Sequence, residues 1–357
     1  MGMQINMPSC YIQEKNAINN ISKYLKWLHN NKALIIMDEF TYNNLKGSII
    51  EGLDRDDIEY CIEQFSGQCS RKNIDRLIEV AKITESKIVI GIGGGKTLDV
   101  AKAVAHFNEM KSIIIPTSAS TDGACSKLSV LYDDNGSFEE YVVLDRNPEA
   151  VIVDLEVIIN APIRLFKAGI GDAISTYFET EAGYEGQIED VSKGKMSLTA
   201  RVISKECFSI IMAHGQEAIK AVEEKHITDN FEQVVEAIIY LSCMGFENGS
   251  LAAAHAVANA LSDGEYNNEL LHGEKVAFGT IVQILLYKKC GKNLIDVINF
   301  FKKVGLPTNI NAVGLTIDDV DRFIEKLCKE GQPIYNMKKE YCNFDNISAA
   351  IRYTNNL

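Results

Sequence analysis

The sequence predicts an α/β domain with a parallel sheet, followed by an all-helical domain. Short β-branched runs alternate with amphipathic segments in the first half, the strand signal then fades, and apolar residues recur at helical spacing in the second half. At 357 residues the chain is long enough for two domains. We expect these domains to be residues 1–162 and 163–357.

Four short runs in the first half are typical of buried strands. They are KALIIMD (32–38), SKIVIGIG (86–93), KSIIIP (111–116) and AVIVD (150–154). Between them lie helical segments such as residues 73–83, whose apolar stripe consists of Ile74, Leu77, Ile78 and Ala81. This alternation predicts a parallel sheet that helices cover on both faces.

The second half is predicted to form a series of helices. The segments concerned are residues 197–213, 231–245, 275–291 and 294–305. In the first segment the residues at helical spacing are Leu198, Val202, Ile203, Cys207, Ile210 and Ile211. Several segments end in glycine, which often caps a helix C-terminus. A cleft between two such domains is the usual place for a small ligand.

Composition excludes several classes of function. The net charge of −13 argues against a nucleic-acid partner. No apolar run reaches about 18 residues, so no membrane-spanning helix is expected, and the N-terminus lacks the features of a signal peptide. The nine cysteines are scattered, odd in number and never spaced C-x-x-C, which predicts free thiols in a reducing cytoplasm.

A glycine-rich stretch, GIGGGKTLDVAKAVA (91–105), ends a predicted strand and leads into a helix near Thr97. It lacks the P-loop glycine, because Ile90 stands there, and the third glycine of the dinucleotide fingerprint, because Lys96 stands there. Its place still suits a phosphate, since backbone N–H groups and the positive helix end would meet there. The alternative is a tight turn with an exposed lysine.

Asp38 ends the first predicted strand. In nucleotide-binding sheets an acid at this place often accepts a hydrogen bond from a ribose hydroxyl and repels a 2′-phosphate, which would favour NAD over NADP. The alternative is a helix N-cap in front of EFTYNNL (39–45).

Small hydroxyl residues fill PTSASTDGACSKLSVLY (116–132). This segment follows a predicted strand, so it is expected at the same sheet edge as the glycine stretch. There it would let a flat ring approach the backbone, and Asp122 would accept hydrogen bonds from a polar substrate. The alternative is an ordinary surface loop.

Two of the six histidines, His255 and His272, stand apart from the rest. His255 lies in the small-residue segment 249–261, a predicted buried helix, and His272 lies at a turn into the next helix. Each alone is explained as a core residue, and Asp172 as a helix N-cap. Together, one carboxylate and two imidazoles form a ligand set for Zn²⁺ or Fe²⁺ with open positions. Such a metal would lower the pKa of an alcohol, which could then release hydride to a cofactor.

These motifs together resemble those of the NAD-dependent, metal-containing glycerol dehydrogenases, within the wider group of iron-containing alcohol dehydrogenases and dehydroquinate synthases. The resemblance covers almost the whole chain, and its most specific parts are residues 245–261 and LLHGEKVAFGT (270–280). It implies the dehydroquinate synthase-like fold, in which an NAD-binding α/β domain precedes a helical domain that binds metal and substrate. It also implies a homo-oligomer.

The resemblance further implies roles for single residues. Asp172, His255 and His272 match the metal ligands, usually zinc, while Asp122 matches a residue near the glycerol hydroxyls and His255 also faces the substrate. The positions that match cofactor contacts are Asp38, Gly94, Gly95, Lys96, Thr117, Ser120, Ser126, Leu128 and Tyr132. In such enzymes the metal chelates a vicinal diol, and hydride passes from its C2 to the nicotinamide.

The sequence departs from the family pattern at two places. Ala258 stands where many members carry a second histidine in the form HAxHN, and STDGAC (120–125) replaces STDAPC. Neither change removes a metal ligand, so both bear on substrate preference and on the shape of the loop.

The leading hypothesis is reversible, NAD-dependent oxidation of glycerol to dihydroxyacetone at a zinc or iron ion in the interdomain cleft. A rival keeps this chemistry but takes another small polyol or sn-glycerol 1-phosphate. A phosphate needs a basic pocket, and Lys275 alone is placed near the predicted metal. A lyase of the dehydroquinate synthase type would need more basic residues still, and the intact ligand set disfavours a non-catalytic regulator.

Overall fold

The computed structural model describes residues 2–29, 32–133, 138–189, 194–262, 266, 269–287 and 293–357. A six-stranded sheet dominates the N-terminal part, in the order β1-β8-β5-β4-β2-β3, and each neighbouring pair is parallel. The strands are β1 (Cys10–Glu14), β2 (Lys32–Met37), β3 (Glu59–Gln64), β4 (Ile88–Gly93), β5 (Lys111–Pro116) and β8 (Ala150–Asp154). The predicted parallel sheet is therefore confirmed.

Four of these strands coincide with the predicted runs, and the other two were not predicted. Both β1 and β3 lie at the edges of the sheet, where their residues are only half-buried or exposed, include several polar ones, and give a weak apolar signal. The sequence also missed an antiparallel pair of strands, β6 (Leu128–Tyr132) and β7 (Phe138–Val143). The last residues of the hydroxyl-rich segment 116–132 thus form strand β6.

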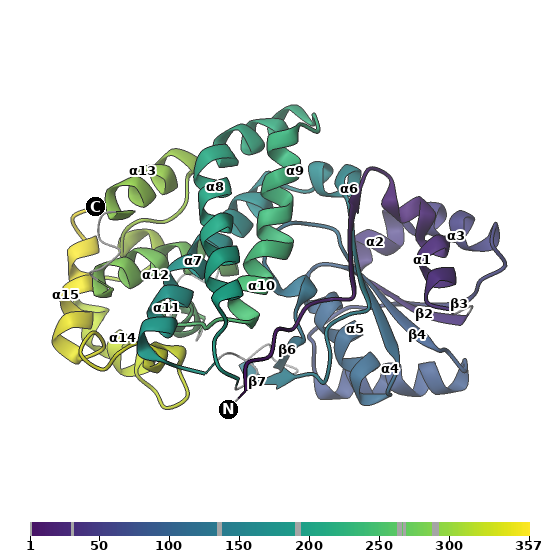
Figure 1. Cartoon of the computed structure of the whole chain (residues 1–357), viewed down its shortest axis with the longest axis horizontal. Helices are drawn as coiled ribbons and strands as arrows, with labels where there is room; N and C mark the ends of the chain where they lie inside the picture. Colours follow the sequence, from purple (N-terminus) through teal and green to yellow (C-terminus); the bar gives the residue numbers. More distant parts are fainter. Residues whose placement is uncertain are drawn as a thin grey trace.

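Helices cover both faces of the sheet, because alternate residues of its strands point to opposite sides. Leu34 and Ile36 of β2 pack with α4 (Arg71–Ile83) and α5 (Gly95–Phe107). Ile35 and its neighbours pack with the opposite layer. That layer consists of η1 (Ala17–Asn20), α1 (Ile21–Trp27) and α3 (Lys46–Asp54), and the short α2 (Glu39–Asn44) lies beside it (Figure 1).

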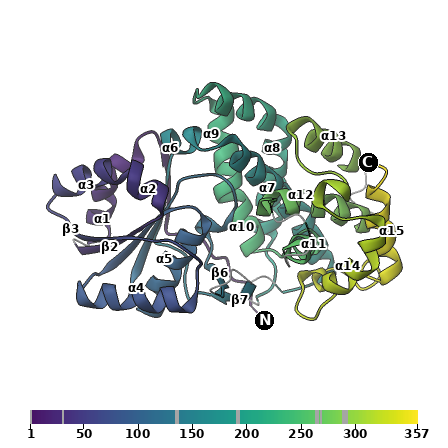
Figure 2. The same ribbon diagram turned by 180° about the vertical axis from the view of Figure 1, so that it is seen from behind.

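Beyond β8, the part of the chain that the structure describes is mainly helical. After α6 (Leu155–Asn160), its main helices are α7 (Ile163–Gly186), α8 (Leu198–Glu224), α9 (Asp229–Glu236), α10 (Ser242–Glu247), α11 (Ala253–Leu261), α12 (His272–Leu286), α13 (Leu294–Val304), α14 (Val320–Leu327) and α15 (Phe344–Thr354). They form a bundle at one end of the molecule, with the sheet at the other, as the two opposite views show (Figures 1 and 2). The division into domains at residue 162 stays a prediction. No helix within the described ranges is long and apolar enough to cross a membrane.

The helical predictions need three corrections. Leu198 and Val202 are exposed by 63% and 60%, so the apolar pattern at the start of α8 faces outward. Residues 231–245 form α9, a π-helical turn (Ala237–Leu241) and α10 rather than one helix, and Gly245 is buried within α10. Gly305, by contrast, caps α13 in the left-handed conformation that favours glycine.

Candidate metal centre and cofactor edge

Asp38 and the glycine stretch meet at the carboxyl edge of the sheet, between the neighbouring strands β2 and β4. From β2 the chain continues to β3 on one side, and from β4 it continues to β5 on the other side, so this is the topological switch point at which open α/β sheets bind their ligands. The Oδ1 atom of Asp38 accepts a hydrogen bond from the Thr41 N–H at 2.8 Å, and Oδ2 accepts one from the Gly94 N–H at 2.9 Å. Asp38 is therefore the N-cap of α2, and it also stabilises the glycine stretch through its hydrogen bond with Gly94.

The glycine stretch forms the tight connection from β4 into α5. The helix begins at Gly95, two residues before the expected start, and Gly94 is its N-cap without any side-chain cap. Gly93 has φ 154°, and a Cβ there would lie 2.3 Å from Asp38 Oδ2. The side chain of Lys96 is exposed. The first turn of α5 thus presents uncapped N–H groups, a lysine and no obstructing side chain.

A cavity of about 570 Å³ opens at this edge. Its lining includes Asp38, Gly94, Thr117, Ser118 and Asn160. Its size is that of a site for a drug-sized molecule. The structure therefore brings three predicted cofactor residues, Asp38, Gly94 and Thr117, to one cavity.

The other predicted cofactor contacts lie along the segment that follows β5. Ser120 is half-buried and accepts a hydrogen bond from Ser118 Oγ at 3.1 Å, whereas Ser126 is buried and donates to the Gly123 carbonyl at 3.0 Å. Leu128 and Tyr132 are the first and last residues of β6, and both are partly exposed. The hydroxyl of Ser126 is therefore used within its own loop.

Lys102 holds this segment in place, and the sequence analysis missed it. Its side chain is almost fully buried, pairs with Asp99 Oδ1 at 3.0 Å, and donates hydrogen bonds to the carbonyls of Gly123 and Leu128. The signal was a lysine among the apolar residues of a helix, since a buried ammonium group needs several partners.

The three predicted metal ligands come together. Donor atoms of Asp172, His255 and His272 all lie within 4.8 Å of one another. Asp172 Oδ1 is 3.6 Å from the Nε2 atom of His255 and 3.4 Å from that of His272. Asp172 lies in the interior of α7, so its interpretation as an N-cap is wrong. His255 lies in the first turn of α11, and His272 is the first residue of α12.

Glycines next to the ligands allow the three helices to approach closely. A Cβ on Gly273 would lie 1.9 Å from the Ala168 carbonyl oxygen, and one on Gly171 would lie 2.6 Å from the Gly273 carbonyl oxygen. On the other side of α12, a Cβ on Gly279 would lie 2.3 Å from the Ala254 carbonyl oxygen. Backbones in contact at these points place short side chains from α7, α11 and α12 within reach of one ion.

The chemistry of the three side chains fits a divalent transition metal. Asp172 is fully buried and its Oδ1 atom accepts no hydrogen bond, while its Oδ2 atom accepts one from the Asp122 N–H at 3.3 Å. A buried carboxylate oxygen without a donor is costly unless a cation satisfies it. Although burial would raise the pKa of Asp172, the two imidazoles hold it below its ordinary value. One carboxylate and two imidazoles suit Zn²⁺ or Fe²⁺.

His255 is fixed by a second carboxylate that the sequence analysis did not identify. Its Nδ1 atom lies 2.7 Å from Oε2 of Glu179, a fully buried residue of α7. Burial alone would lower the pKa of His255, but the carboxylates of Glu179, Asp172 and Asp122 raise it to about 9. Glu179 follows Asp172 by seven residues, which is about two helical turns. This spacing places both carboxylates on one face of a helix and could have identified Glu179 from the sequence.

Asp122, the predicted substrate contact, lies next to Asp172, to which its backbone N–H donates a hydrogen bond. It is buried, and its Oδ2 atom accepts a hydrogen bond from Ser242 Oγ at 2.7 Å. Burial, and then the nearby charge of Asp172, raise its pKa to about 8. The carboxyl group of Asp122 is therefore buried beside Asp172, where it can hydrogen-bond to a polar ligand.

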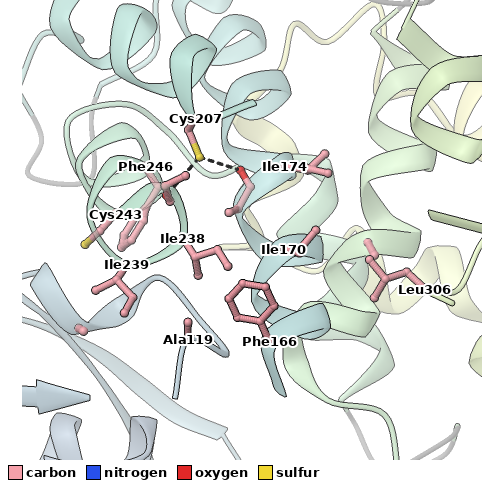
Figure 3. Packing of buried hydrophobic residues seen from close by; sticks show 14 of the residues in the cluster. Ala119, Phe166, Ile170, Ile174, Cys207, Ile238, Ile239, Cys243, Phe246 and Leu306 are labelled. Atoms are coloured by element: carbon pink, nitrogen blue, oxygen red, sulfur yellow. Dashed lines mark hydrogen bonds between the residues drawn. The ribbon is translucent and has the colours of Figure 1, made fainter. Parts of the chain in front are cut away.

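The loop that carries Asp122 packs directly on the helical part. A Cβ on Gly169 of α7 would lie 2.0 Å from the Ala119 carbonyl oxygen. Figure 3 shows Ala119 beside Phe166 of α7, with Ile238 and Ile239 of the π-helical turn close by. This apolar contact joins the cofactor edge of the sheet to the helix that carries Asp172.

Two further positions from the sequence analysis lie along α11 and α12. The Ala258 side chain packs with Ala254 and Val276 in a small apolar cluster. Lys275 is buried, which lowers the pKa of its amine, and it donates a hydrogen bond to Ser262 Oγ at 3.0 Å. Lys275 therefore has a neutral hydroxyl as its hydrogen-bond partner here.

The family model described as iron-containing alcohol dehydrogenase matches residues 12–162. A glycerol dehydrogenase of Citrobacter freundii is 39% identical over 93% of this chain and 92% of its own length. A glycolaldehyde reductase of Halobacterium salinarum is 35% identical over 92% of this chain and 91% of its own.

Solved structures of similar proteins have the same fold. The crystal structure of a probable glycerol dehydrogenase from Sinorhizobium meliloti superposes with a TM-score of 0.91 at 32% identity, over 99% of this chain and 98% of that one. The expected dehydroquinate synthase-like fold is confirmed, and with it the resemblance on which that expectation rested. From its sequence relatives and its fold, the chain is an enzyme that belongs to the iron-containing alcohol dehydrogenase family.

Proposed function

We propose that this enzyme oxidises glycerol to dihydroxyacetone with NAD⁺, reversibly, at a divalent metal ion held by Asp172, His255 and His272. The observation that supports this most directly is the convergence of these three side chains within 4.8 Å, beside the buried Asp122. The similarity to glycerol dehydrogenases over nearly the whole chain supports the choice of substrate.

The cofactor is proposed to lie along the carboxyl edge of the sheet. Gly94, Gly95 and Lys96 would contact the pyrophosphate, chiefly through the uncapped N–H groups of Gly95 and Lys96, because the Gly94 N–H donates to Asp38. The Lys96 ammonium would add its charge. Asp38 would accept a hydrogen bond from a ribose hydroxyl and repel a 2′-phosphate, which favours NAD over NADP. The remaining contacts would come from the segment after β5, namely Thr117, Ser120, Ser126, Leu128 and Tyr132.

Substrate is proposed to bind between this edge and α7. The metal ion, zinc or iron, would supply Lewis acidity that lowers the pKa of a substrate hydroxyl. Asp122 would orient the diol, since its buried carboxyl group lies beside Asp172 and can accept a hydrogen bond from a substrate hydroxyl. Hydride would pass from C2 of glycerol to the nicotinamide, and the apolar contact of Ala119 with α7 would limit the access of water to the site.

The test is NADH formation, followed at 340 nm, with protein stripped by a chelator and reloaded with zinc or iron. Formation that requires both glycerol and metal supports the proposal. If no metal restores turnover with glycerol or any other small polyol, the proposed reaction is wrong.

A second candidate substrate is another small polyol or its aldehyde, because one relative at 35% identity is a glycolaldehyde reductase. Comparing kcat/KM for glycerol, 1,2-propanediol and ethylene glycol, and for glycolaldehyde in the reverse direction, ranks these substrates. sn-Glycerol 1-phosphate belongs in the same series, and we expect poor turnover because a phosphate needs a basic pocket and Lys275 is the one basic residue that the sequence places near the proposed metal. We further propose that the enzyme is a cytoplasmic homo-oligomer, which light scattering and cell fractionation would test.

A further inference from the structure

Glu179 lies where the three ligand-bearing helices meet. It belongs to α7, seven residues after Asp172, so both carboxylates project from the same face of that helix. Its side chain is fully buried. A buried carboxylate must be hydrogen-bonded, and both oxygens of Glu179 have hydrogen-bond partners in or next to α11.

One carboxylate oxygen of Glu179 caps the helix that carries His255. Oε1 accepts hydrogen bonds from the backbone N–H groups of Ala252 at 2.7 Å and His255 at 3.0 Å. Ala252 occupies the N-cap position of α11 and has no side chain that could cap the helix itself. The first turn of α11 is therefore fixed by α7 rather than by its own sequence.

The other oxygen contacts the His255 ring. Oε2 lies 2.7 Å from Nδ1, and Ser175 Oγ lies 3.5 Å from the same oxygen. A carboxylate only accepts hydrogen bonds, so Nδ1 must carry a proton. The lone pair of the neutral ring is then on Nε2, the atom that faces Asp172 Oδ1.

We infer that Glu179 is a positioning residue, which sets both the tautomer and the orientation of His255 for metal binding through Nε2. This inference rests on the proposed metal site. Partners of this kind typically change metal affinity about 10- to 100-fold when they are replaced.

Capping and tautomer control can be separated, because the chain contains a second capping residue that does not touch the ring. Gln283 of α12 accepts a hydrogen bond from the Ala253 N–H at 2.7 Å, and its amide nitrogen donates to the Phe178 carbonyl. Gln283→Met therefore removes one cap from α11 and leaves Glu179 and His255 in contact. It is the matched control for the cap.

Glu179→Gln tests the tautomer. The amide oxygen still accepts the two backbone N–H groups, but the NH₂ group now faces Nδ1 and donates to it. His255 would then carry its proton on Nε2, where the metal should bind. The variant keeps the volume and the cap, yet presents the wrong nitrogen.

The experiment measures Co²⁺ binding to stripped full-length protein by competition with a chromophoric chelator, together with the visible spectrum of the Co²⁺ protein and the unfolding midpoint in EDTA. For Glu179→Gln we expect Co²⁺ affinity to fall about 10- to 100-fold and the spectrum to change. For Gln283→Met we expect a lower unfolding midpoint, with Co²⁺ affinity within about threefold of the unmodified protein.

The outcomes distinguish this inference from the proposed function. If the unmodified protein binds no stoichiometric Co²⁺, the proposed metal site is wrong and the inference falls with it. If the unmodified protein binds Co²⁺ and Glu179→Gln binds it equally well, the metal site stands and the role of Glu179 is overturned.

A measurement on the unmodified protein applies even if Glu179→Gln does not fold. In zinc-loaded protein with ¹⁵N-labelled histidine, the His255 signals are assigned by their loss in His255→Asn. We expect Nδ1 to carry the proton and Nε2 to show the shift of a metal-bound nitrogen. The opposite pattern would overturn the inference.

Discussion

Oδ2 of Asp38 accepts a hydrogen bond from the Gly94 N–H at 2.9 Å, which joins the ends of β2 and β4 at the cofactor cavity. One carboxylate thus braces the glycine stretch and faces the space in which we place the adenosine ribose. The same residue also caps α2 through its Oδ1 atom. Its cofactor role and its structural role can be separated with a substitution that keeps the cap.

Asp38→Ser is expected to relax the preference for NAD over NADP. Serine can still cap α2, but the negative charge that repels a 2′-phosphate is gone. Juxtaposed like charges cost several kcal/mol, so the NADP/NAD ratio of kcat/KM should rise by about 100-fold or more. Steady-state kinetics with both cofactors measure the ratio. Asp54→Ser is the control, since Asp54 ends α3 and does not line the cavity; an unchanged ratio in Asp38→Ser would contradict the ribose assignment.

His272→Asn is expected to remove metal binding and activity together. One imidazole of the ligand set is lost, and amide groups bind zinc poorly in its place. We expect metal content after dialysis to fall well below one ion per chain and kcat/KM to fall by at least about 100-fold. Elemental analysis and the NADH assay measure the two effects. His214→Asn, on α8, should match the unmodified protein in both; retention of metal by His272→Asn would remove this residue from the ligand set.

Gly273→Ala is expected to destabilise the protein and weaken metal binding. Its Cβ would lie 1.9 Å from the Ala168 carbonyl oxygen, so α12 would have to move away from α7 and take His272 with it. Overpacking of this kind costs about 1–3 kcal/mol or more. Urea unfolding in EDTA gives the stability, and chelator competition gives the metal affinity.

Gly47→Ala is the matched control for that substitution. A Cβ at Gly47, in the first turn of α3, meets nothing within 4 Å. Alanine there should leave stability unchanged or raise it by up to about 1 kcal/mol, because alanine favours the helix. Equal stability changes in the two variants would mean that close packing at Gly273 is not required.

Glu247 is expected to make stability fall as pH rises. It is buried in α10, where it accepts hydrogen bonds from the Lys127 N–H at 3.0 Å and from Asn147 Nδ2 at 2.6 Å. Burial raises its pKa from 4.5 to about 7. Between these two pH values the folded protein keeps a proton that the unfolded chain has lost. The stabilisation is complete below about pH 4.5 and disappears as pH rises through about 7, at a cost of about 3 kcal/mol.

Glu247→Gln removes this titration and so isolates its contribution. Unfolding free energies of both proteins, measured by urea titration from pH 4.5 to 8, should show the steeper decline in the unmodified protein. The difference between the two curves cancels the other titrating groups. Parallel curves would show that Glu247 titrates at its ordinary pKa in the folded protein.

Local sequence patterns predicted the sheet because they depend on short-range physics. The interior strands β2, β4, β5 and β8 are buried on both faces, so their residues form uninterrupted β-branched runs. The edge strands β1 and β3 are only half-buried, so they contain polar residues, and the apolar pattern did not predict them. The segment 231–245 was predicted as one helix because a π-helical turn keeps nearly the same apolar period.

The sequence by itself determined the chemistry of this protein: a glycine turn between strand and helix, an acid after a strand, and one carboxylate and two imidazoles in small-residue segments. Only the tertiary structure decided how these groups meet. Asp172 and His255 are 83 residues apart in sequence (255 − 172), and their contact depends on helices packed through glycine, which local periodicity does not encode. The roles of Glu179 and Lys102 were assigned only from the tertiary structure. A buried charged group must be satisfied by hydrogen-bond partners, and those partners come from distant parts of the sequence.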